Sequence, residues 1–131
     1  MTYPKIFVAG CWEKRKEIGI IIKRFEEIVD ITHDWTVHED ESLFTNESYL
    51  KCQAILDADG LDRADYLVVI MDKENYPYMG TWTEIGMAIS NGIGILLYNP
   101  VKACMNNVYM RHPLVKNFDS LNEIAEYLKK V

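Results

Sequence analysis

Glu84 is the residue whose type and position fit chemistry best. It lies in the first turn of a predicted helix that follows residues 66–71, an apolar run typical of a parallel strand buried on both faces. In open parallel sheets, ligands bind outside the carboxyl ends of the strands. A carboxylate there can act as a nucleophile, and the positive end of the helix dipole is expected to keep it ionised.

The same residue also fits a purely structural role. Thr81 and Glu84 have the spacing of a capping box, in which Thr81 is the N-cap and Glu84 bonds back to its amide. Ser120 and Glu123 repeat the pattern before the last predicted helix, where no site is expected. The pattern alone leaves both interpretations of Glu84 open.

Asp57 is a second candidate. On the predicted helix 46–63 it shares a stripe with apolar residues that should face the core, namely Leu50, Ala54 and Leu61. An isolated buried carboxylate is costly, so Asp57 must either face a cavity or bond to loop amides near the helix end. Only a tilted helix would bring it to the upper edge of the sheet.

Strands and helices alternate along the whole chain. The apolar periods predict strands at residues 5–10, 31–35, 66–71, 93–98 and 114–118, and helices at residues 12–29, 46–63, 81–91 and 120–130. An acidic loop covers residues 37–45. This pattern predicts one α/β domain over residues 1–131, with a flavodoxin-like (Rossmann-like) three-layer fold. Its five-stranded parallel sheet should have the order 2-1-3-4-5.

In this order the ligand site lies between the first and third strands. The loop after Gly10, the loop of residues 72–79 and Glu84 should therefore line it. Those loops carry the aromatic residues Trp12, Tyr76 and Tyr78, which can stack on a nucleobase or simply pack.

Composition argues against several classes of partner. The formal net charge of −6 argues against a nucleic-acid polymer, because phosphate backbones are bound by clustered cations. The one basic cluster, residues 14–16, either meets a small anion or forms a solvated helix face. All apolar runs are of strand length, so we expect no membrane span and a cytoplasmic protein.

The cysteines indicate neither a disulfide framework nor a zinc site. Cys11, Cys52 and Cys104 are odd in number and widely spaced, which fits reduced thiols. No set of metal ligands is visible, and we expect no metal and no cofactor. Cys11 lies in the first strand-to-helix loop, but no His follows at a spacing that suggests an activating partner.

These motifs resemble the nucleoside 2-deoxyribosyltransferase and nucleotide N-glycosidase superfamily. The resemblance covers roughly residues 5–98. It is carried by residues 7–10, by Asp57 eight positions before Asp65, by the strand entry 64–69, and by Gly80-x-x-x-Glu84-Ile85-Gly86-x-Ala88.

The resemblance implies an enzyme that cleaves or transfers an N-glycosidic bond. Glu84 would attack the anomeric carbon of the sugar, and Asp57 would assist at the sugar or in protonating the departing base. The substrate would be a nucleoside or a nucleoside 5′-monophosphate, bound in a homo-oligomer with shared sites. The residues expected to contact it are Gly10, Cys11, Trp12, Trp35, Tyr78, Gly80 and Thr81.

The chain departs from both subtypes of the superfamily. Tyr78 stands where the transferases often have an Asp and the hydrolases a Ser that contacts phosphate. The phosphate loop of the hydrolases is absent after Gly10, and the extended C-terminal segment of the transferases is shortened. Transfer and hydrolysis both stay open, and so does a non-catalytic nucleotide-binding or sensing module. His33 and His38 fit strand-surface or loop positions better than catalytic bases.

Overall fold

The computed structural model describes residues 2–37 and 45–131. It contains five strands, β1 (Lys5–Gly10), β2 (Asp30–Ile31), β3 (Tyr66–Ile70), β4 (Gly94–Tyr98) and β5 (Val115–Phe118). The α-helices are α1 (Arg15–Phe25), α2 (Glu47–Asp62), α3 (Met79–Ser90) and α4 (Leu121–Lys129), and short 3₁₀ helices are η1 (Trp12–Lys14), η2 (Trp35–Val37) and η4 (Val108–Arg111). The sheet is parallel with the order β2-β1-β3-β4-β5, which confirms the predicted fold.

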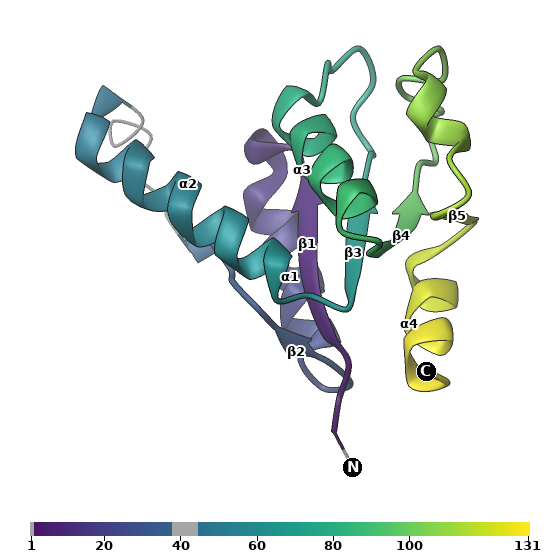
Figure 1. Ribbon diagram of the computed structural model, residues 1–131. Coiled ribbons are helices and arrows are strands. Elements are labelled where there is room, and N and C mark those ends of the chain that lie inside the picture. The colour runs from purple at the N-terminus through teal and green to yellow at the C-terminus, as the bar shows by residue number, and fades with distance from the viewer. Residues whose placement is uncertain (1, 38–44) are drawn as a thin grey trace.

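The three central strands are buried on both faces because their side chains alternate between two cores. The core on one face includes Phe7, Ala9, Leu67, Val69, Ile95 and Leu97, together with residues of α2 and α3. The core on the other face includes Ile6, Val8, Val68, Ile70 and Leu96, together with residues of α1 and α4. Helices therefore cover both faces of the sheet, as Figure 1 shows.

The second strand is much shorter than predicted. The sequence indicated a strand over residues 31–35, but only Asp30 and Ile31 pair with β1, at Lys5 and Ile6. Trp35 instead begins η2 and donates a hydrogen bond from its indole Nε1 to the carbonyl oxygen of Val8, at 2.6 Å. The indole thus satisfies a β1 carbonyl that lies beyond the end of β2.

The helix that carries Glu84 begins earlier than predicted. Thr81 is not the N-cap, because α3 starts at Met79 and Tyr78 precedes it with a left-handed φ of 53°. The proposed capping box is therefore wrong, and Glu84 lies in the second turn. The same pattern at Ser120 and Glu123 does cap its helix. The Ser120 hydroxyl accepts a hydrogen bond from the amide of Glu123 at 3.1 Å, at the beginning of α4.

The other differences from the predicted elements are small. The first helix divides into η1 and α1 and ends at Phe25 instead of residue 29. The second helix begins as predicted, with the Asn46 side chain accepting from the amide of Tyr49 at 3.0 Å. His38 and most of the acidic loop lie outside the described residues. Within the described ranges, no helix is both long enough and apolar enough to cross a membrane.

Candidate active site at the carboxyl edge of the sheet

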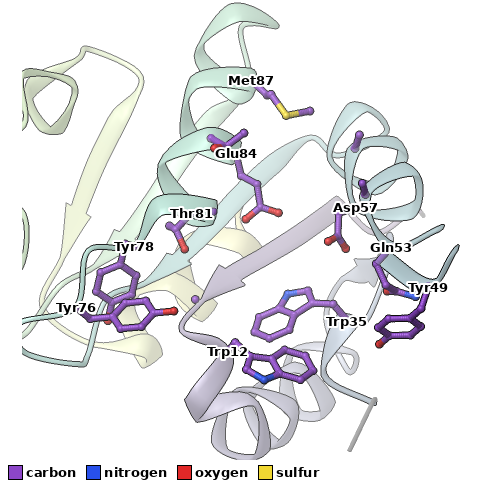
Figure 2. Close-up of a pocket in the computed structure, with 15 residues that line it drawn as sticks. Trp12, Trp35, Tyr49, Gln53, Asp57, Tyr76, Tyr78, Thr81, Glu84 and Met87 are labelled. Atoms are coloured by element: carbon purple, nitrogen blue, oxygen red, sulfur yellow. The ribbon is translucent and has the colours of Figure 1, made fainter. Parts of the chain in front are cut away.

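A cleft of about 440 Å³ opens at the carboxyl ends of β1 and β3. Its volume falls in the range of small-molecule sites. Its lining comes from the loops after these strands, from η2 and from α2 and α3 (Figure 2). The residues that line it are Gly10, Trp12, Trp35, Tyr49, Gln53, Ala54, Asp57, Ala58, Tyr76, Tyr78, Gly80, Thr81, Thr83, Glu84 and Met87.

Glu84 and Asp57 enter the cleft from opposite sides. Figure 2 shows the Glu84 side chain pointing inward from α3 and that of Asp57 pointing inward from α2. Burial, and in second place the charge of Asp57, raises the pKa of Glu84 to about 8. The expectation that the helix dipole keeps Glu84 ionised at pH 7 is therefore not met. Desolvation outweighs the dipole because Glu84 lies one turn inside the helix.

Asp57 faces the cleft and not the hydrophobic core. In α2, only Gly60 and Leu61 at the C-terminal end are fully buried, and Ala54 is exposed. Figure 1 shows α2 strongly inclined to the strands, with its N-terminal half displaced from the sheet. This tilt brings the middle of the helix to the upper edge of the sheet. The condition that the sequence set for Asp57 to reach this edge, a tilted helix, is therefore met.

Two tryptophans form one wall of the cleft. The rings of Trp12 and Trp35 lie with their centroids 6.2 Å apart. Trp35 is held by its hydrogen bond to Val8, and the guanidinium of Arg15 lies 4.5 Å from the centre of the Trp12 ring. These contacts fix an apolar, electron-rich surface beside the two carboxyl groups.

Two tyrosines form a second wall. The Tyr76 and Tyr78 rings meet edge to face, with centroids 4.6 Å apart. Tyr78 is only 1 % exposed, and its hydroxyl accepts a hydrogen bond from the amide of Lys73 at 2.9 Å. Burial raises the pKa of Tyr78 to about 12, so the phenol stays neutral and acts as a fixed anchor for its loop.

Of the expected contact residues, only Cys11 is absent from the lining. Its side chain is fully buried in the core. Burial, and in second place the neighbouring Cys11 thiol, raises the pKa of Tyr76. Gly10 lines the cleft. A Cβ at this position would lie 2.6 Å from Cδ1 of Ile18 and 3.3 Å from the carbonyl oxygen of Ile70, so a larger residue there would require the Ile18 side chain to shift.

The structure adds residues that the sequence analysis missed. Tyr49 and Gln53 line the cleft on the same side of α2 as Asp57. Their spacing of four residues from one to the next is the sequence signal that places them on one side of the helix, and it is a polar stripe rather than an apolar one.

His33 lies in the loop after β2, in agreement with the prediction of a strand-surface or loop position. Its side chain is only 18% exposed, and its Nε2 lies 3.6 Å from Oδ1 of Asp57. Gly60 permits this approach, because a Cβ there would come within 2.9 Å of the His33 Cβ. His33 therefore lies beside Asp57 without lining the cleft, a contact that no local pattern could predict across 24 positions.

The charge of the site limits the chemistry it can perform. Among the described lining residues, Glu84 and Asp57 are the only ionisable acids apart from the tyrosines, and none is Lys or Arg. In residues 2–37 and 45–131, no three His, Cys, Asp or Glu side chains are grouped to hold a metal ion. Two carboxyl groups between aromatic walls suit attack on a sugar carbon and protonation of a leaving group.

Comparisons with known proteins bear on this arrangement at the level of the fold. The chain matches no protein-family model and no curated protein sequence. A solved structure of a 2-deoxyribosyltransferase from Bacillus psychrosaccharolyticus superposes with a TM-score of 0.70 at 19% identity, covering 94% of this chain and 91% of that one. The CMP N-glycosidase BcmB of Clostridium botulinum superposes with a TM-score of 0.54 at 18% identity, covering 97% of this chain and 99% of that one. The chain therefore has the same fold as these two enzymes.

Proposed function

We propose that this protein cleaves or transfers the N-glycosidic bond of a nucleoside. The observation that carries the proposal is the pair of carboxyl groups, Glu84 and Asp57, that enter one aromatic-walled cleft from opposite sides. The superposed enzymes, a deoxyribosyltransferase and a CMP N-glycosidase, support the same class of bond. Such a reaction needs one carboxylate to attack the sugar and one acid to protonate the base.

The two carboxyl groups divide these tasks by sharing one proton. In the reactive form the proton is on Asp57 and Glu84 is ionised. A Glu84 oxygen bonds to the anomeric carbon as the bond to the base breaks, and the base nitrogen takes its electron pair and the proton of Asp57. Water or a second base then attacks the anomeric carbon, Glu84 leaves, and Asp57 regains a proton from the attacking group.

The aromatic walls suit the base, and the charge of the cleft favours an unphosphorylated sugar. A planar base can stack against Trp12 or Tyr76. A 5′-phosphate would approach two carboxyl groups without a basic residue in the described lining. Lys14 and Lys73, in the neighbouring loops, are paired with Asp72 and Glu13.

A panel of substrates tests this proposal. Free base is measured by chromatography after incubation with nucleosides, 2′-deoxynucleosides and their 5′-monophosphates, with and without an acceptor base. We expect a nucleoside to be used with a kcat/KM at least about tenfold above that of its 5′-monophosphate, since like charges repel in the cleft. Release without acceptor indicates hydrolysis, and product only with acceptor indicates transfer. A preference for the monophosphates would contradict the assignment of substrate.

A binding or sensing module on the same fold is the second candidate. The raised pKa of Glu84 favours it, because a mostly protonated carboxyl group at pH 7 is a poor nucleophile. This alternative requires saturable quenching of tryptophan fluorescence by nucleosides without base release or exchange. Turnover in the panel above that is lost on substitution of Glu84 would reject it.

A further inference from the structure

Two ion pairs join the loops that carry the aromatic walls. Lys73 Nζ pairs with Oε2 of Glu13, and Lys14 Nζ lies 3.6 Å from Oδ2 of Asp72. Lys14 also donates a hydrogen bond to the carbonyl oxygen of Asp72, at 3.3 Å. Glu13 and Lys14 belong to η1, and Asp72 and Lys73 follow β3. Each loop therefore supplies the acid of one ion pair and the lysine of the other. We call these four residues the loop clasp.

The loop clasp lies where the sheet brings the two loops together. β1 and β3 are paired up to Gly10 and Ile70, so their chains leave the sheet side by side. Trp12 directly precedes Glu13, and the Tyr76 ring lies under Lys73, whose Nζ is 5.5 Å from the ring centre. Lys73 thus contacts both the Tyr76 ring and Glu13, the residue next to Trp12.

We propose that the loop clasp positions Trp12 relative to Tyr76 and so sets the width of the cleft for a planar base. The inference rests on the proposed function, because it takes the cleft as the ligand site. Within it, Glu13, Lys14, Asp72 and Lys73 are positioning residues that touch neither the sugar nor the carboxyl groups. Without the loop clasp the two loops move independently, so ligand binding carries the entropic cost of fixing them.

The ion pairs are partly exposed, so their effect is modest and sensitive to salt. The side chains of Glu13 and Lys73 are 62% and 34% exposed. Exposed pairs are individually weak and are screened by salt. The hydrogen bond to Glu13 nevertheless raises the pKa of Lys73, so the lysine stays charged across the neutral range.

Charge reversal tests the positioning role. Glu13→Lys and Lys73→Glu should each raise KM for the best nucleoside of the panel about three- to fivefold, with kcat changed less than twofold. The double variant, which restores the pair in reversed order, should return KM to within twofold of wild type. Glu126→Lys with Lys129→Glu reverses an exposed pair on α4, remote from the cleft, and should leave KM unchanged. Equal KM in wild type and single variants, or a double variant no better than the singles, would overturn the proposal.

A second readout does not depend on turnover. The indole N–H signal of Trp12 can be identified in ¹H–¹⁵N NMR spectra by its loss in Trp12→Phe. In the ligand-free protein, Glu13→Lys and Lys73→Glu should each shift or broaden this signal, and the double variant should restore it. An unshifted Trp12 signal in both single variants would overturn the loop clasp even if the panel detected no reaction. A restored signal with no base release would instead count against the proposed function alone.

Discussion

Glu84→Gln should lower the rate of base release or exchange by at least about a thousandfold, because the amide cannot form the bond to the anomeric carbon. Glutamine has nearly the shape of glutamate, and it removes a carboxyl group whose pKa burial has already raised to about 8. The variant should therefore fold and still bind nucleosides. Initial rates by chromatography, together with tryptophan quenching, separate lost chemistry from lost binding.

Glu123→Gln is the matched control for this variant. Glu123 also lies near the beginning of a helix, but it is exposed on α4, where its carboxylate accepts a hydrogen bond from the amide of Asp119 at 2.9 Å. Its substitution should leave the rate unchanged. Substantial activity in Glu84→Gln would show that another group attacks the sugar.

Asp57→Asn should lower kcat about a hundredfold or more and change the form of the pH profile. In the wild type, kcat/KM should fall as pH rises through about 8, because the pair then loses the proton that Asp57 gives to the base. The variant has no such proton to lose. Its residual activity should instead rise with pH until Glu84 is fully ionised.

The direction in which the rate changes with pH shows whether Asp57 is the proton donor or Glu84 titrates alone. Removal of the Asp57 charge also removes one of the causes that raise the pKa of Glu84, so the rising limb of the variant should lie below pH 8. Asp62→Asn, at an exposed position at the end of α2, serves as the control and should keep the wild-type profile. A wild-type rate that rises through pH 8 would mean that Glu84 titrates alone and that Asp57 is not the proton donor.

The sequence predicted the sheet and the position of the cleft well because both depend on strong local signals. The apolar runs of β1, β3 and β4 can be buried on both faces only in a covered parallel sheet. The switch point then follows from the strand order. A cavity was one of the two surroundings predicted for Asp57, because a buried carboxylate needs polar partners. Asp57 does line the cleft, although Ala54 of the same stripe is exposed and only Leu61 of the stripe is fully buried in the core.

The features that sequence could not give depend on contacts between distant residues. The shortness of β2 follows from the Trp35 indole, which bonds to Val8 and replaces strand pairing. The start of α3 follows from the anchored phenol of Tyr78, which outweighs the local capping signal of Thr81. The protonation of Glu84 is set by burial against other elements, whereas the sequence shows only its place along the helix.

Mass spectrometry of the quenched enzyme tests the central claim most directly. Wild-type protein is mixed with the best nucleoside of the panel, stopped with acid within the first turnovers, and digested. A glycosyl group should be found on the peptide that contains Glu84, and it should be absent from Glu84→Gln and disappear when excess acceptor base is added. Turnover without any covalent adduct, or an adduct on another residue, would contradict the account.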